Sequence, residues 1–478
     1  MSQPTLKVQK YKHPVSLYLL FFTELWERFS YYGMKSILIL FLTSSSLSSN
    51  PGWNWNYSNA IMLLSYYTFS VYLLSIVGGL CSVYLFNPRI MVMIGAFLLF
   101  LGHISLIFKT QFFFYTGLFL IILGVGALKP NISTLVGSLY KKSDKNREIG
   151  FSIFYIGINI GSLLGMLIIG FIGELYDWHL GFGMAGLGMF IGLLTYIIGH
   201  KYIIKDIKYD DKQVISYTFS SIKKLKNIKY ILLSYLIIII FFMAFEQASG
   251  LLTIYANEKI NRHIFFYEIL YILLVINFIC IVYCFFRKKC NILLTMLLVF
   301  IFLIYMLFNC NYLLIIPASW FQASNALFIL ILGIPIAKFW LWWNKNESYL
   351  FKMNTGLLII GVSYLFMALA ASQYNQCGYS SMYYLIISYL LQTIGELCLS
   401  PVALSFISRS VPDKYVSLMM GIFFAVTGFG GLIAGFVGSL ISSYKELDIF
   451  LYIALICIIA SFIYNILIKI LEKNETSH

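Results

Sequence analysis

The sequence predicts an all-α protein that crosses a membrane many times. Of its 478 residues, 60% are hydrophobic and only 11% are charged, whereas soluble domains carry about 25% charged residues. The mean hydropathy is +0.85, and the apolar residues gather in unbroken runs long enough to cross a bilayer as helices. Such runs exclude a transmembrane β-barrel, whose strands are short and alternate in polarity.

Fourteen apolar segments have the length of a membrane-spanning helix. The first follows a polar, basic N-terminus and is too long for the core of a cleavable signal, so we expect it to be retained. The predicted spans are residues 15–42, 58–86, 90–108, 112–139, 149–173, 180–203, 228–255, 265–286, 291–309, 322–343, 354–372, 381–408, 415–441 and 448–470.

The basic residues predict the orientation, because cytoplasmic loops carry an excess of lysine and arginine. With a cytoplasmic N-terminus, outer loops hold only four of the 33 basic residues, namely Lys109, Lys259, Arg262 and Lys445. Both termini are therefore predicted to be cytoplasmic. The net charge of +14 is explained as an insertion signal that also attracts anionic lipid, so we expect no nucleic-acid partner.

A basic cytoplasmic segment divides the chain. Residues 201–229 hold eight lysines and separate the first six spans from the other eight. We expect an N-terminal six-helix bundle at 1–203, a linker at 204–227 and a C-terminal unit at 228–478. Metal or redox chemistry is not expected, because none of the eight cysteines forms a Cys-x-x-Cys pair. Cys310 and Cys377 both fall in predicted outer loops, so a disulfide between them stays open.

The first span carries an unusual set of charges, since burying a charge in a membrane costs several kcal/mol unless it is paired. Glu24, Arg28, Tyr31 and Lys35 follow the spacing of one helical face, and Glu27 borders it. A stripe with both signs of charge cannot face lipid, so we expect it to line a wet interior. The alternative is a static ion-pair lock at Arg28, which leaves the second acid and Lys35 unexplained.

Three further charges lie in the middle of predicted spans: Lys129, which precedes Pro130, and the two acids Glu246 and Glu396. We expect the helix to break at Pro401, just after Glu396. Each is a functional candidate, because a buried carboxylate is suited to exchanging protons near neutral pH. The structural alternatives are a lysine that reaches the cytoplasmic interface and acids that stay protonated and hydrogen-bonded.

Together these charges favour a substrate with two charged ends. The lysines of the first half would attract a carboxylate, and Glu396 of the second half would attract an amine. The remaining acids would carry protons. Two similar halves that rock about a site in the middle of the membrane are the usual arrangement of a secondary transporter.

The first span also resembles a family signature. Glu24-Leu-Trp-Glu-Arg-Phe-Ser-Tyr-Tyr-Gly33 is similar to the ExxERFxYYG motif of the proton-dependent oligopeptide transporters, a branch of the major facilitator superfamily. Matches to other motifs of that family follow in order: Leu128-Lys-Pro-Asn-Ile-Ser-Thr-Leu-Val-Gly137, Gly150-Phe-Ser-Ile-Phe-Tyr-Ile-Gly-Ile-Asn-Ile-Gly161, Phe245-Glu-Gln247, Ile316-Pro-Ala-Ser-Trp-Phe-Gln322 and Gly395-Glu-Leu-Cys-Leu-Ser-Pro401.

The resemblance implies a major facilitator fold and proton-coupled import of di- and tripeptides by alternating access. It implies a cofactor-free monomer that spans the bacterial inner membrane. The implied proton-coupling residues are Glu24, Glu27, Arg28 and Glu246. The implied substrate-binding residues are Lys35 and Lys129 for the peptide carboxylate, Glu396 for the amino terminus, and Tyr31, Tyr32, Tyr72, Asn159 and Asn325 around them.

The chain departs from the family at several positions. Lys35 stands where arginine is common, and this loses a bidentate grip on carboxylate. Phe242 and Phe423 stand where many members carry tryptophan. Val83 and Asn87 replace an aspartate and a glycine of the cytoplasmic-loop motif, which puts the usual cytoplasmic latch in doubt.

The position of the two extra spans is a further departure. In bacterial members they lie between the sixth and seventh core helices, but the linker 204–227 is polar and too short for them. Instead, the runs 265–286 and 291–309 interrupt the next connection, and Arg287-Lys288-Lys289 separates them. We therefore expect an accessory hairpin at about 265–309, packed outside a twelve-helix core.

Other functions compete with this interpretation. The same fold could carry an amino acid, nitrate or a drug-like molecule, because fold does not fix substrate; Glu396 would repel nitrate. An intramembrane enzyme is disfavoured, since no HExxH or Ser/His/Asp-like arrangement is present. A sensor or scaffold derived from a transporter is suggested only by the altered loop motif.

Overall fold

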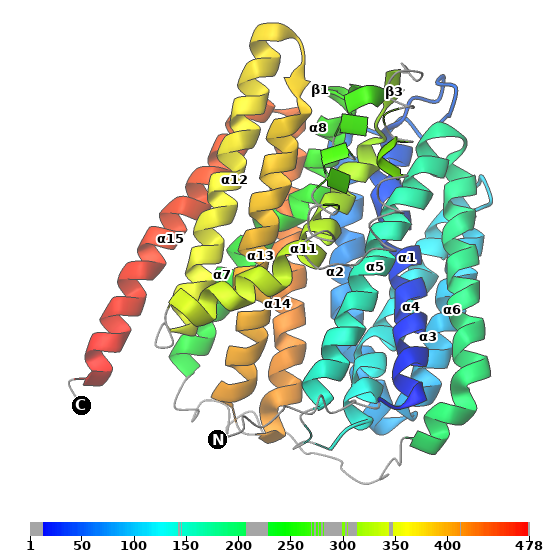
Figure 1. The fold of residues 1–478 in the computed structure, drawn as a ribbon, viewed down its shortest axis with the longest axis vertical. Helices are drawn as coiled ribbons and strands as arrows, with labels where there is room; N and C mark the ends of the chain where they lie inside the picture. Colours follow the sequence, from blue (N-terminus) through cyan, green and yellow to red (C-terminus); the bar gives the residue numbers. More distant parts are fainter. Residues whose placement is uncertain are drawn as a thin grey trace.

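The computed structural model describes residues 13–141, 144, 146–206, 228–268, 270–271, 274–275, 277–278, 281, 299–301, 304, 313–343, 348–411 and 413–476. In these residues the chain is an all-α bundle (Figure 1), and eleven of its helices are long and apolar enough to cross a membrane. The first helix, α1 (Val15–Thr43), is equally long but carries the four charges of the first span. Twelve of the fourteen predicted spans therefore coincide with described helices.

The N-terminal half contains six helices, which lie on the right in Figure 1. Besides α1 they are α2 (Tyr57–Tyr84), α3 (Pro88–Ser105), α4 (Gln111–Ser138), α5 (Asn146–Leu175) and α6 (Trp178–Asp206). Short polar turns with N-cap side chains, such as Asn56 and Asn87, start α2 and α3. Glycines let α1 and α5 approach closely, since Gly161 and Gly165 lie against the α1 backbone.

The C-terminal half begins with an interrupted span. Helix α7 (Ile228–Phe245) ends in a 3₁₀ turn, η2 (Glu246–Ser249), and α8 (Leu251–Glu258) then continues in the same span. The sequence predicted one continuous helix at 228–255. The break coincides with Gly250, whose backbone lies outside the helical region at φ −112° and ψ −93°.

Five further long helices are described in this half. They are α11 (Ala318–Trp343), α12 (Tyr349–Cys377), α13 (Met382–Ser410), α14 (Asp413–Ser439) and α15 (Glu446–Thr476), with a 3₁₀ turn, η3 (Leu440–Ser442), before the last. A proline break was expected just after Glu396. Instead α13 runs through Pro401, because packed neighbouring helices can accommodate the missing N–H group.

Two small sheets mark one end of the bundle, which we call the strand end (top in Figure 1). The first pairs β1 (Ile260–Asn261) with β4 (Ser380–Ser381) in parallel. The second pairs β2 (His263–Phe265) with β3 (Leu313–Ile315) in antiparallel register. The second sheet brings together the two ends of segment 266–312, which contains the predicted hairpin. Most of the hairpin, most of the linker 204–227 and Cys310 lie outside the described residues.

The two halves meet along two helix pairs, α2 with α14 and α5 with α11. In the first pair, Gly428 of α14 sits against Tyr72, and Gly431 lies near Thr68. In the second pair, Gly170 of α5 lies against Ser319 of α11. These close contacts flank the space between the halves, where the charged residues gather.

Candidate functional site

A cavity of about 310 Å³ lies between the two halves. Its wall contains ten of the twelve residues singled out in the sequence: Arg28, Tyr31, Tyr32, Lys35, Tyr72, Lys129, Asn159, Glu246, Asn325 and Glu396. Phe242 and Phe423 also line it. Basic side chains come from α1 and α4, and the carboxylates come from η2 and α13, so the two halves present opposite charges to the same space.

Glu24 and Glu27 lie beside the cavity, outside its wall, and make a compact cluster with Arg28. The Arg28 Nε lies 3.0 Å from Glu24 Oε1, and the same nitrogen contacts Glu27 Oε2. All three side chains are almost completely buried. The guanidinium also lies over the rings of Tyr31 and Tyr32, at 5.5 and 5.7 Å from their centroids. One cation therefore serves two acids and packs on the cavity wall.

Lys35 and Glu246 form an ion pair across the two halves. Lys35 Nζ lies 2.9 Å from Glu246 Oε2, and both side chains are largely buried. Lys35 comes from α1, and Glu246 sits at the interruption after α7. Phe242 and Phe245 of α7 line the same cavity, so Glu246 continues this face at the start of the 3₁₀ turn.

Lys129 has a different environment. Its Nζ lies 4.6 Å from the ring centroid of Tyr72 and 5.3 Å from that of Phe424. Among the described residues it makes no ion pair with a carboxylate. A lysine held on aromatic faces inside the bundle does not reach the interface, so the structure does not support the snorkelling alternative.

The opposite wall holds an oriented carboxylate. Asn325 Nδ2 donates to Glu396 Oε2 at 3.0 Å and to Thr393 Oγ1 at 3.1 Å. On the N-terminal half, Asn159 donates to the backbone oxygen of Tyr155 at 2.9 Å. Because one amide fixes one oxygen of Glu396, the other is left for a ligand or a proton.

Neutral residues of the wall carry no signal in the charge pattern. Tyr155, Phe245, Phe424 and Gln392 all line the cavity, yet such residue types are common throughout the apolar spans. Tyr155 falls inside the matched 150–161 motif, which could have suggested it. Within the described residues no group of three His, Cys, Asp or Glu side chains is placed to hold a metal ion.

A polar network at the strand end also gave no signal in the charge pattern of the sequence. Glu174 falls just beyond the predicted span 149–173, so it was not counted among the buried acids. The structure extends α5 to Leu175, and the Glu174 carboxylate contacts the first residues of α11. The sequence offered no signal for this partner, which lies more than 140 positions away.

Comparisons with known proteins agree with this arrangement. A family model described as "POT family" matches residues 88–222 and 272–454. The chain is 32% identical to "Uncharacterized transporter YclF" of Bacillus subtilis, over 96% of this chain and 95% of that protein. It is also 32% identical to a "Di-/tripeptide transporter" of Lactococcus lactis subsp. cremoris, over 96% of each chain.

A solved structure gives the same picture at the level of the backbone. A "peptide transporter POT in complex with sulfate" superposes with a TM-score of 0.77 at 26% identity. The match covers 96% of each chain. The likeness therefore spans both halves and the cavity between them.

Proposed function

The chain belongs to the POT family, a branch of the major facilitator transporters, and from that premise we propose that it imports di- and tripeptides together with protons. As a member of this family it is a multi-pass peptide transporter of the plasma membrane and not an enzyme. The observation that carries the proposal is the cavity between the halves, with lysines on one wall and Glu396 on the other. Two separated charges of opposite sign suit the two ends of a short peptide.

Lys129 is proposed to bind the peptide carboxylate. Its side chain lines the cavity, with Nζ over the rings of Tyr72 and Phe424, and makes no ion pair among the described residues. Its charge is therefore available to a ligand. Lys35 is the second proposed carboxylate ligand, but it is already paired with Glu246. It would reach the substrate only after that pair separates.

Glu396 is proposed to bind the peptide amino group through the oxygen that Asn325 leaves free. The same cavity is lined by Tyr31, Tyr32, Tyr72 and Asn159, which would contact the peptide backbone and side chains. These assignments are supported by position on the wall and by residue chemistry.

Proton coupling is proposed to use two acid–base clusters. Protonation of Glu246 would remove the negative partner of Lys35 and free the lysine for substrate. In the second cluster, Glu24 and Glu27 share the single positive charge of Arg28. Two carboxylates at one site disfavour each other's ionisation, so one acid is suited to carry a proton. The Lys35–Glu246 pair joins the two halves and would separate when they rock, whereas the Arg28 cluster lies within α1.

The positive-inside rule places the strand end on the outer face. The contacts between the halves that lie at this end, such as those of Glu174 with α11, would then close the outer side and leave the cavity facing the cytoplasm. We propose that the twelve described spans are the transport unit and that it works as a monomer in the bilayer. The boundaries 1–203, 204–227 and 228–478 are retained as its proposed division.

The test is uptake of labelled dialanine into proteoliposomes with and without an inward proton gradient. Accumulation that needs the gradient and is abolished by a protonophore is the expected result. Saturable uptake that ignores the gradient would leave the peptide site and remove the coupling. Absence of uptake by folded protein would transfer the proposal to another small solute, such as an amino acid or a drug-like molecule.

A further inference from the structure

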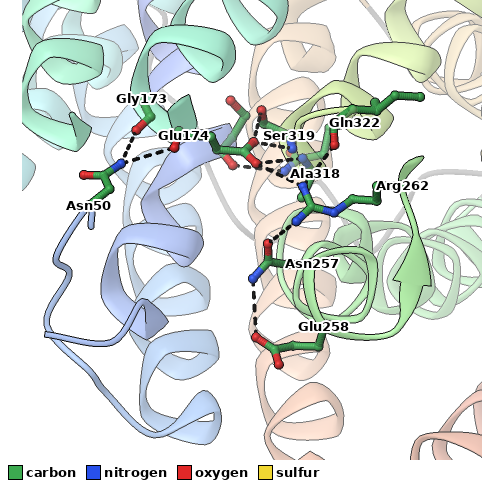
Figure 2. A network of polar contacts seen from close by, with 11 residues as sticks. Asn50, Gly173, Glu174, Asn257, Glu258, Arg262, Ala318, Ser319 and Gln322 are labelled. Atoms are coloured by element: carbon green, nitrogen blue, oxygen red, sulfur yellow. Dashed lines mark hydrogen bonds and ion pairs between the residues drawn. The ribbon is translucent and has the colours of Figure 1, made fainter. Parts of the chain in front are cut away.

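At the strand end, a carboxylate of one half caps a helix of the other. Glu174, in the last turn of α5, accepts hydrogen bonds from the backbone N–H groups of Ala318 and Ser319, each at 2.8 Å, and from Ser319 Oγ at 2.5 Å (Figure 2). The first N–H groups of a helix have no partner within it, and the helix dipole favours an anion there. Glu174 therefore stabilises α11 from across the interface.

Arg262 adds a positive charge to the same carboxylate. Its Nη1 lies 3.5 Å from Glu174 Oε2 and donates to the backbone oxygen of Ile316 at 3.0 Å. Its Nη2 donates to Asn257 Oδ1 at 3.0 Å. Burial lowers the pKa of the guanidinium from its ordinary value, but arginine stays charged in proteins. A largely buried charge pair of this kind is costly to break from one side.

The arginine stands at the base of the inserted segment. It lies between β1 and β2, and its main-chain oxygen accepts from the N–H of Ile316, just after β3, at 3.0 Å. Because β2 and β3 pair with each other, the base of segment 266–312 is held as one unit with Arg262. The insertion is thereby attached to the contact between the two halves.

The other side of the contact is equally well fixed. Asn50 Nδ2 donates to the backbone oxygens of Gly173 and Glu174, at 2.7 and 3.3 Å (Figure 2). Trp320 Nε1 of α11 donates to the backbone oxygen of Leu167 at 2.9 Å. A Cβ at Gly170 would lie 3.0 Å from the Ser319 Cβ, so α5 and α11 touch directly. The end of α5 is thus held in place to meet α11.

We propose that Glu174 is the latch of the outer gate, and that Arg262 at the base of the insertion completes it. The inference rests on the proposed alternating access, in which the strand end must open to the outside. The donors to the Glu174 carboxylate, at the start of α11 and at Arg262, all belong to the C-terminal half, so they meet it only while the two halves touch at this end. Opening would separate them and expose each group to water, so the latch stabilises the closed outer side in a reversible way.

The test measures how often the cavity opens outward. Ser162 lines the cavity and is almost completely buried, so a cysteine there would react with a membrane-impermeant maleimide outside intact cells only when the gate opens. The parent is Cys377→Ser, because Cys377 is exposed, and the parent without Ser162→Cys gives the background. Labelling rates are then compared with and without Glu174→Gln.

The glutamine keeps the shape but loses the charge, and its amide N–H groups would face the donors of α11. We expect the labelling rate to rise about tenfold, which corresponds to about 1.4 kcal/mol. Ser319→Ala and Arg262→Gln remove one partner each and should give smaller rises. They keep the proposal testable if Glu174→Gln folds poorly in a size-exclusion assay.

Asp177 supplies the matched control, since it is an acid at the same end whose ion pair stays within one half. It pairs with Lys109 at 3.0 Å. Burial alone would raise the pKa of the Asp177 carboxyl, but the hydrogen bonds from Lys109, Leu180 and His179 hold that pKa below its usual value. Asp177→Asn retains an oxygen to cap α6 and should leave the labelling rate unchanged.

An unchanged rate in Glu174→Gln, or equal rises in Glu174→Gln and Asp177→Asn, would overturn the latch. The measurement needs neither peptide nor proton gradient, so it separates the latch from the substrate. A rise in labelling without any peptide uptake would support the latch and count against the proposed function. Normal uptake with unchanged labelling would support the proposed function and count against the latch.

Discussion

Lys35 and Glu246 are joined by an ion pair of 2.9 Å between Nζ and Oε2, although 211 positions separate them in the chain. The pair links α1 of the first half to the interruption that follows α7 in the second. Each partner also lines the cavity. A contact that joins the two halves and reaches the candidate substrate site is well placed to couple the two.

Replacing Glu246 by glutamine should uncouple transport from the proton gradient. The neutral amide cannot change charge, so Lys35 would lose the partner whose protonation releases it. We expect gradient-driven accumulation of dialanine to fall by about tenfold or more, equivalent to at least about 1.4 kcal/mol. Counterflow exchange of peptide should change much less, and both are measured in proteoliposomes.

The matched control is Glu446→Gln, because Glu446 pairs with Lys259 at 3.5 Å within the C-terminal half. This variant should accumulate peptide normally. An equal loss of accumulation and exchange in Glu246→Gln would remove the coupling role and leave Glu246 with a structural one.

Glu396→Gln should weaken binding of peptides that have a free amino terminus. The charge-assisted bond to the ammonium would become a neutral one, which costs about 1–2 kcal/mol or five- to thirtyfold in affinity. N-acetyl dialanine lacks the ammonium and should bind weakly to the parent protein. Calorimetry with both ligands on both proteins forms a double-mutant cycle. Independent, additive losses would refute a contact between Glu396 and the amino group.

Lys129→Gln should act on the other end of the peptide. The variant should lose affinity for dialanine but little for dialanine amide, which has no carboxylate. In the parent protein dialanine amide should bind about tenfold more weakly than dialanine, a difference of about 1.4 kcal/mol in binding free energy. Lys129→Arg keeps the charge and should recover part of the affinity. A similar loss for both ligands would show that Lys129 does not contact the carboxylate.

The sequence predicted the helices and the residues of the cavity better than their pairing. Apolar runs identify spans because the bilayer imposes a length. Charges such as Lys129 and Glu396 stand out because membrane burial of charge is costly. That argument holds for any buried charge, so it identifies candidate residues but not the residues with which they pair. It did not predict that Glu246 meets Lys35 or that Glu24 and Glu27 lie outside the cavity wall.

The hydropathy pattern of the sequence also did not predict two local features of the backbone. The interruption at Gly250 lies within a run that reads as continuous apolar helix, whereas Pro401, which suggested a break, lies inside α13. Tertiary packing decided both cases, since neighbouring helices determine whether a freed backbone group finds a partner. Glu174 was missed for a related reason. Its role depends on the start of α11, and hydropathy carries no information about which helix end lies beside it.

Close packing of α1 against α5 should make Gly165 intolerant of a side chain. A Cβ there would lie 2.8 Å from the carbonyl carbon of Phe29, and backbone atoms at that position cannot move aside easily. We expect Gly165→Ala to destabilise the protein by about 1–3 kcal/mol, as overpacking commonly does.

Gly333→Ala is the control, because no atom lies within 4 Å of its added Cβ. Alanine is the better helix former by about 1 kcal/mol, so that variant should be as stable as the parent or more so. Thermal unfolding of the three proteins in one detergent measures the difference. Equal midpoints for Gly165→Ala and Gly333→Ala would mean that the contact of α1 with α5 accepts an added methyl group without cost, which would contradict the close packing of the two helices.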